Sequence, residues 1–269
     1  MSVGAVIPPA VRALLLAGAA TLGLGMTLLV WKTTAIGSML FMNHGMSHER
    51  TVLVELVLGW ALIGLVVTLA WSPARGWAAA GLLAVAAFLA WANVDQGGYP
   101  FSRFAWGAHA LRLAAPLALL LAVLPWSPLA VVRRQVVTAL LLTTTALVFI
   151  VHGVEALAAH PWFTDMTIGA FRMIGGWRIS QATAESILKV VGSVDLLVAV
   201  GVLVFRRPWI AGWMAGWGLF TAALRPLNYG WGAMGELIVR LPHFLLPLAL
   251  LLLFRVRAFS PPSPTPQSP

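Results

Sequence analysis

The chain has 269 residues, of which 60% are hydrophobic and 9% are charged, and its formal net charge is +9. This composition excludes an ordinary soluble domain and is typical of an integral membrane protein. The sequence contains no cysteine, which excludes disulfides, thiol exchange and cysteine-ligated iron–sulfur clusters within the chain. The basic residues are spread over short loops between apolar segments, so membrane topology explains the charge better than nucleic-acid binding does.

Apolar segments recur along the whole chain. Crossing about 30 Å of hydrocarbon takes a helix of about 20 residues, and eight segments approach or exceed that length: 13–31, 52–71, 77–94, 106–124, 135–154, 186–205, 209–224 and 237–254. We therefore predict an all-α polytopic membrane protein with eight transmembrane helices, whose termini share one side because the number is even. Two further apolar stretches, 35–43 and 163–174, are too short to span and are predicted to lie at the membrane interface.

The charged residues divide unequally between the two sides of this topology. The side that holds both termini carries eight basic residues and no acid, whereas the other side carries nine basic residues, all eight acids and all six histidines. The positive-inside rule makes the first side cytoplasmic, in the cytoplasmic (inner) membrane of a bacterium. Side-chain chemistry is therefore expected on the outward face, where the longer loops also lie.

The two halves of the sequence resemble each other. RLAAPLALLL (112–121) resembles HFLLPLALLL (243–252), and RALLLAGAATL (12–22) resembles TALLLTTTALV (138–148). A repeat unit of four helices inserts twice in the same orientation, so the repeats are predicted to be parallel. We divide the chain into a first four-helix repeat (1–130), a second four-helix repeat (131–257) and a disordered Pro/Ser-rich cytoplasmic tail (258–269).

Alignment of Pro116 with Pro247 places a His-x-x-Arg motif, His109 and Arg112, opposite an Arg-x-x-His motif, Arg240 and His243. Residues three apart share a helix face, and charges within a membrane usually face the bundle interior or a wet cavity. We expect the two pairs to face an outward-opening cavity between the halves and to bind a cofactor. The alternative is structural: the arginines reach the outer headgroups and the histidines bond the backbone.

The second half resembles a known family. LVFIVHGVEAL (147–157) and LKVVGSVDLLVAVGVLVFRRP (188–208) are similar to the DoxX/DoxD-like membrane proteins, in which a His-Gly pair ends the first helix of a four-helix unit. The resemblance covers about 135–254, and through the repeat 13–124 more weakly. It implies a small membrane partner of redox systems that in some members passes electrons to quinone. Ala156 stands where the family often has lysine, and Met26-Thr27 stands where the second half has His152-Gly153.

Three residues of the second half are candidates for catalysis. His152 and Glu155 have the i, i+3 spacing that lets an imidazole and a carboxylate share a proton or a ligand. Asp195 lies near mid-bilayer, where a carboxylate is expected to be neutral or paired, with Arg112 or Arg240 as the expected partner. The structural alternatives are that Glu155 only orients His152 and that Asp195 is a hydrogen-bonded helix-packing residue. Glu55 is a weaker candidate, four residues into its span.

The stretch FMNHGMSHER (41–50) raises the question of a metal site. Met42, His44, Met46 and His48 stand at every second position, and in an extended segment they would converge as ligands for Cu(I). Ser47 is instead a good N-cap, with Glu49 in the first turn of the next helix, and a helix beginning there would take His48 out of line. Haem held by two of His109, His152 and His243 is a further alternative.

Three functions follow from these observations. The first is a membrane subunit of a quinone-linked extracytoplasmic redox system, which binds quinone or another hydrophobic ligand in the outward cavity. The second is a copper-binding or copper-handling membrane protein that uses the loop 42–48. The third is a scaffold without chemistry that docks other subunits at its extracytoplasmic face. Whether the protein is an enzyme differs between them, but all three place it in a lipid bilayer.

Overall fold

The computed structural model describes residues 7–32, 34–97, 100–124 and 130–258, and within these ranges all regular structure is helical. The first half contains α1 (Pro9–Val30), α2 (Ala35–Met42), α3 (His48–Ala70), η2 (Ser72–Ala74), α4 (Arg75–Gln96), η3 (Ser102–Phe104), α5 (Ala105–Ala108) and α6 (Ala110–Val123). The second half contains α7 (Ala130–Leu157), α8 (Pro161–Gly175), α9 (Gln181–Phe205), α10 (Pro208–Tyr229), η5 (Trp231–Ala233), α11 (Met234–Ile238) and α12 (Pro242–Ala258). The predicted tail lies outside the described residues, apart from Ala258, which ends α12.

Seven segments of the described chain are long and apolar enough to cross a membrane. They contain α1, α3, η2 with α4, η3 to α6, α7, α9, and η5 to α12. The remaining predicted span, 209–224, corresponds to α10, which has 22 residues but does not belong to this set. Its sequence includes polar residues such as Arg225 and Asn228, which lower its hydropathy. A multi-pass helical membrane protein is therefore supported, whereas the eighth span is not confirmed.

The order of the elements in the first half recurs in the second. A long helix, a short helix and two long helices are followed by a 3-10 turn, a short helix and a last long helix, and only η2 lacks a counterpart among the described elements. The starts of α3 and α9 (48 and 181) and the starts of α4 and α10 (75 and 208) are both 133 residues apart. The short helices α2 and α8 cover the two stretches predicted to lie at the interface.

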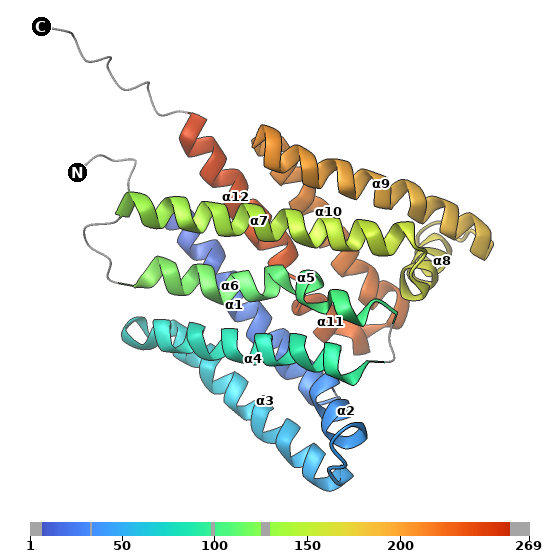
Figure 1. Ribbon diagram of the computed structural model, residues 1–269, viewed down its shortest axis with the longest axis horizontal. Coiled ribbons are helices and arrows are strands. Elements are labelled where there is room, and N and C mark those ends of the chain that lie inside the picture. Colours follow the sequence, from blue (N-terminus) through green and yellow to red (C-terminus); the bar gives the residue numbers. More distant parts are fainter. Residues whose placement is uncertain (1–6, 33, 98–99, 125–129, 259–269) are drawn as a thin grey trace, which may run out of the picture.

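The first and last long helices of each half form the centre of the bundle. α1, α6, α7 and α12 pack against one another, with α3 and α4 on one flank and α9 and α10 on the other. In Figure 1, α1 begins and α12 ends toward the left, so both lie at one end of the bundle, whereas α8 lies at the opposite end. One continuous cluster of buried apolar side chains, from Ile7 to Phe254, joins the central helices.

The last long helix of each half is interrupted at a corresponding place. α5 and α6 are separated by His109, and α11 and α12 are separated by a turn at 239–241. Pro242 begins α12 and cannot donate a backbone hydrogen bond to the preceding turn. Gly25 of α1 lies against this second break, where a Cβ atom would come within 2.2 Å of the Val239 backbone nitrogen. The breaks bring polar residues inside the bundle, where they help to form the site.

Candidate functional site

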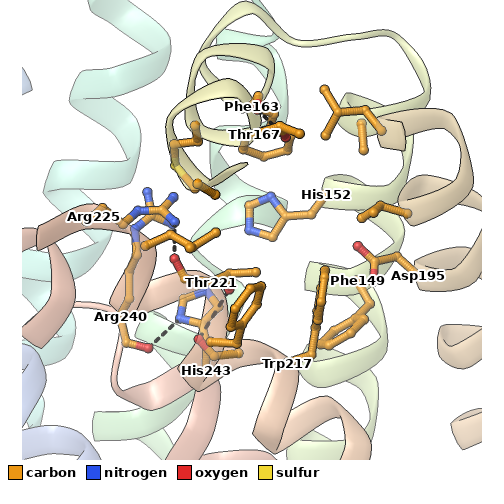
Figure 2. A pocket seen from close by; sticks show the side chains of 18 of the residues that line it. Phe149, His152, Phe163, Thr167, Asp195, Trp217, Thr221, Arg225, Arg240 and His243 are labelled. Carbon is orange, nitrogen blue, oxygen red and sulfur yellow. Dashed lines mark hydrogen bonds between the residues drawn. The ribbon is translucent and has the colours of Figure 1, made fainter. Parts of the chain in front are cut away.

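A cavity of about 220 Å³ lies within the second half of the chain. Its wall comes from α7, α8, α9, α10 and α12 and is mostly apolar and aromatic, with Phe149, Phe163, Trp217 and Phe220 among its members. The polar side chains that face it are His152, Thr167, Asp195, Thr221, Arg225, Arg240 and His243 (Figure 2). Apolar walls with a few converging polar groups are the usual form of a small-molecule site.

The position of the cavity corrects the expectation that it would lie between the halves. The halves meet through α1, α6, α7 and α12, which pack closely. In the second half α9 packs mainly on α7 and α10 mainly on α12, and α9 and α10 have little contact with each other although a short turn joins them. This divergence, partly covered by α8, leaves the space for the cavity.

His152 and Glu155 form the contact that their spacing predicts. The Nδ1 atom of His152 lies 2.9 Å from Oε2 of Glu155, and the Glu155 side chain is only 10% exposed. When Glu155 is ionised, its carboxylate can only accept, so Nδ1 of His152 carries the hydrogen and donates the hydrogen bond to Oε2 of Glu155. In the neutral imidazole the other nitrogen, Nε2, then has a free lone pair. Glu155 therefore fixes both the orientation and the tautomer of His152, in the way that carboxylates orient catalytic histidines.

Asp195 faces the cavity from α9 and is only 5% exposed. The indole group of Trp217, on α10, lies within hydrogen-bonding range of its carboxyl group. No ion pair joins Asp195 to Arg112 or Arg240 within the described chain, so the partner expected from the sequence is wrong. In Figure 2, Asp195 lies on the opposite side of the cavity from the arginines, which explains why they do not meet.

Arginines gather at the other side of the cavity. Arg225 and Arg240 line it, and Arg112 lies behind them, close enough for all three guanidinium groups to interact electrostatically. The Nη1 atom of Arg112 lies 3.2 Å from Nε2 of His109, as the motif predicts. His243 instead uses Nδ1 to donate to the Arg240 carbonyl oxygen, at 3.1 Å. The first pair therefore joins two side chains, whereas the second joins a side chain to the backbone.

Glycines allow the helices around the cavity to approach closely. Gly153 of α7 and Gly192 of α9 face each other, and a Cβ atom at Gly192 would lie 2.6 Å from the Gly153 carbonyl oxygen. Gly218 of α10 lies against α12 in the same way, with the His243 carbonyl oxygen 2.2 Å from the position of a Cβ atom. The first contact sets the spacing of the two helices that carry His152 and Asp195.

The structure brings most of the predicted site together. His152 and Glu155 lie near the cluster of His109, Arg112, Arg240 and His243, and the rings of His152 and His243 are 6.2 Å apart between centroids. Sequence analysis missed Arg225 and Trp217. Arg225 falls one residue after the predicted end of its span at 224, but α10 continues to Tyr229, so this arginine lies inside the helix, where an intramembrane charge indicates a functional site.

The loop 42–48 lies elsewhere and does not have the backbone that the copper hypothesis requires. Met42 ends α2, Gly45 has a φ of +63°, and His48 begins α3. Ser47 is the N-cap and accepts a hydrogen bond from the Arg50 nitrogen at 3.4 Å, which confirms the capping prediction. The chain is therefore not extended, and the side chains of Met42, His44, Met46 and His48 do not follow the alternation that would make them converge. His44 instead contacts Asp95, with 3.4 Å between Nε2 and Oδ2.

Two other polar groups have structural roles. Glu55 is buried and accepts hydrogen bonds on Oε1 from the backbone nitrogen of Thr34 at 2.6 Å and from its hydroxyl at 2.9 Å. Thr34 is the N-cap of α2, so Glu55 holds this short helix against α3. At the opposite end of the bundle, Arg12, Arg75 and Arg133 line a second hollow, and each donates to a backbone carbonyl oxygen close to the end of a helix, those of Ile7, Leu69 and Leu124 respectively.

The chain matches no model of a known protein family, no curated protein and no solved structure. Membership of the DoxX/DoxD-like family therefore stays a prediction from the sequence motif. In the structure the two parts of that motif meet, because Gly153 packs on Gly192 while His152 and Asp195 face the same cavity.

Proposed function

We propose that the protein is a membrane subunit of a quinone-linked redox system and that it binds a quinone ring in the cavity of its second half. The observation that carries this proposal is the cavity itself. Aromatic side chains wall it, and two groups able to exchange protons, His152 and Asp195, face it from different helices. A quinone ring is flat and apolar, with a carbonyl oxygen at each end, which matches such walls and such groups.

The route to the cavity supports a ligand that comes from the bilayer. α9 and α10 diverge beside the cavity, and Phe220, which lines it, is 43% exposed on the outside of the bundle. On α9, Val190 and Val194 each follow a cavity-lining side chain, Ile187 or Val191, by three residues, and both are exposed and apolar. A hydrophobic ligand would enter between these two helices without crossing a polar surface.

The proton chemistry of the proposal uses residues of this chain. Reduction of a quinone to a quinol consumes two electrons and two protons. In quinol oxidation, the free Nε2 atom of His152, which Glu155 orients, and an ionised Asp195 would accept the two protons of the quinol hydroxyl groups. In quinone reduction both groups would first take up a proton and then donate it to the two carbonyl oxygens. The electrons would come from a redox cofactor of a partner subunit, because a chain without cysteine holds no thiol or cysteine-ligated cluster of its own.

We further propose that the chain forms two parallel four-helix repeats with eight spans, namely the seven apolar segments and α10. The recurring order of elements supports this arrangement, as does the spacing of 133 residues shared by the starts of α3 and α9 and of α4 and α10. The positive-inside rule then places both termini in the cytoplasm of a bacterium and the site near the outer face of its cytoplasmic membrane. Partner subunits would dock on the extracytoplasmic side.

The test is to purify the protein in lipid nanodiscs, identify extracted quinones by mass spectrometry and measure the affinity for decylubiquinone by calorimetry. Asp195→Ala and His152→Ala are expected to weaken binding by about tenfold or more, because alanine offers the ligand no hydrogen-bonding group. The matched controls are Asp165→Ala and His48→Ala, because both residues are exposed and neither lines the cavity.

The outcomes separate the three functions. Binding that falls in the site variants and is retained in the controls supports the proposal. Absence of quinone, together with equal behaviour of all four variants, refutes it. Co-purification of a soluble partner in that second case favours a scaffold, and copper that is lost on substitution of His44 and His48 favours copper handling.

A further inference from the structure

The arginine cluster carries more positive charge than the acids beside it neutralise. Arg112 and Arg225 are 7% and 3% exposed, and the Arg240 side chain is 18% exposed. Glu236 is the acid that acts on all three guanidinium groups, and Glu155 acts on Arg240. Glu155 is also the acceptor for His152. Three guanidinium groups therefore face two carboxylates, which leaves one positive charge without a counter-charge. A buried charge that is not compensated strongly destabilises a protein.

The hydrogen bonds of the cluster are also incomplete. The Nε atoms of Arg112, Arg225 and Arg240 and the Nε2 atom of His243 are buried and have no partner within the described chain. The nearest acid is not well placed for Arg240, since 3.8 Å separates its Nε atom from Oε2 of Glu236. Most buried polar atoms in folded proteins are hydrogen-bonded. The arginine cluster therefore has four buried nitrogen atoms that are free to bond a ligand or water.

The cavity gives this cluster access to a ligand. Arg225 and Arg240 come from α10 and from the turn before α12, and their side chains converge at one end of the cavity (Figure 2). Asp195 lies at the other end, so the two ends differ in charge, and aromatic side chains lie between them. The N-terminus of α12, at Pro242, lies beside the arginines and adds the positive end of a helix dipole.

We propose that the arginine end of the cavity binds an anionic group, a carboxylate or a sulfate- or phosphate-type oxyanion, carried by an amphipathic ligand. Guanidinium groups match the geometry of these anions and form charge-assisted hydrogen bonds with them. The anion would neutralise the remaining positive charge, and its apolar part would lie between the aromatic walls. The inference rests on the proposed function in one respect, namely that a ring-bearing ligand occupies the same cavity, and it goes beyond that function because a neutral quinone such as decylubiquinone carries no anionic group for the arginines.

Benzoate and methyl benzoate are the probes that test this inference, because they share a ring and a carbonyl group but only benzoate is charged. Calorimetric titration of the full-length protein in detergent is expected to give an affinity for benzoate at least about tenfold higher than for methyl benzoate. Arg225→Gln and Arg240→Gln are expected to abolish that preference. Arg178→Gln is the matched control, because Arg178 is exposed and does not line the cavity.

A parallel titration with inorganic sulfate distinguishes the sources of the anion. If sulfate binds as tightly as benzoate, the site is one for free oxyanions. If benzoate binds more tightly than sulfate, the site is one for the anionic end of an amphipathic ligand. Equal affinities of the unmodified protein for benzoate and methyl benzoate overturn the inference. This comparison uses only the unmodified protein, so it does not depend on whether a variant folds. Decylubiquinone binding without a preference for benzoate refutes this inference alone, whereas a benzoate preference without quinone binding refutes only the proposed function.

Discussion

Gly192→Ala tests whether the close approach of α7 and α9 positions the site. The added Cβ atom would lie 2.6 Å from the Gly153 carbonyl oxygen and 2.9 Å from the Leu157 nitrogen, both of them backbone atoms that cannot rotate away. The two helices would have to separate, and overpacking of this kind typically costs about 1–3 kcal/mol. Because α7 carries His152 and α9 carries Asp195, the affinity of the cavity for decylubiquinone is expected to fall as well.

Gly216→Ala on α10 is the matched control, because a Cβ atom there would meet no other atom within 4 Å. Both substitutions add the same methyl group to a helix and gain the same intrinsic helix preference, about 1 kcal/mol. The difference between the two variants therefore isolates the packing term, and thermal unfolding in detergent measures it as a difference in Tm of several degrees. A Gly192→Ala protein at least as stable as Gly216→Ala would show that the helices do not meet in this way.

Three other substitutions test local contacts. Glu155→Gln keeps the shape of the side chain but removes the charged acceptor of His152, so decylubiquinone affinity is expected to fall about tenfold; unchanged affinity would refute the role of Glu155. Glu55→Gln weakens the two bonds to Thr34 and is expected to cost about 1–3 kcal/mol and to speed hydrogen exchange in α2, while cavity binding stays constant; slower exchange would contradict this. Ser47→Ala is expected to lose about 1 kcal/mol and to speed exchange only in the first turn of α3, and exchange equal to that of the unmodified protein would argue against the cap.

The helices could be predicted from the sequence because membrane spans are set by length and hydropathy, which are local properties. The short helix α8 was also predictable, since its apolar run is interrupted and too short to span. The helix ends were less accurate: α9 begins at Gln181, five residues before the predicted span, because Ser180 caps a first turn that is polar and extends beyond the apolar run. α10 shows the limit of prediction from hydropathy. It is long enough to span a membrane, but its polar residues lower its mean hydropathy, so it does not belong to the seven apolar segments.

The site could be predicted only where its residues are neighbours in the sequence. His152 with Glu155, and His109 with Arg112, meet through helical spacing, and both contacts are present. The partner of Asp195 could not be found in this way, because Trp217 reaches it from another helix and the choice depends on how far α9 and α10 diverge. The cavity has the same origin, since a gap between two diverging helices leaves no periodic pattern in either of them.

The proposed repeat explains why the second half has a cavity where the first half is filled. At the spacing of 133 residues, Asp195 corresponds to Leu62 and Arg225 to Ala92, and the alignment of the first helices places Met26 opposite His152. All three first-half residues are at most 1% exposed and belong to the apolar interior.

The helices of the two halves also pack differently. α3 packs against α4 in the first half, whereas their counterparts α9 and α10 have little contact. Polar side chains at these positions need space, water or a ligand, whereas leucine, alanine and methionine pack directly against their neighbours. The first half thus contributes a packed support that carries Arg112 and His109 to the edge of the site, and in the proposed function the chemistry belongs to the second half. Substitutions that enlarge the Leu62 side chain should therefore act on stability, and those at Asp195 on ligand binding.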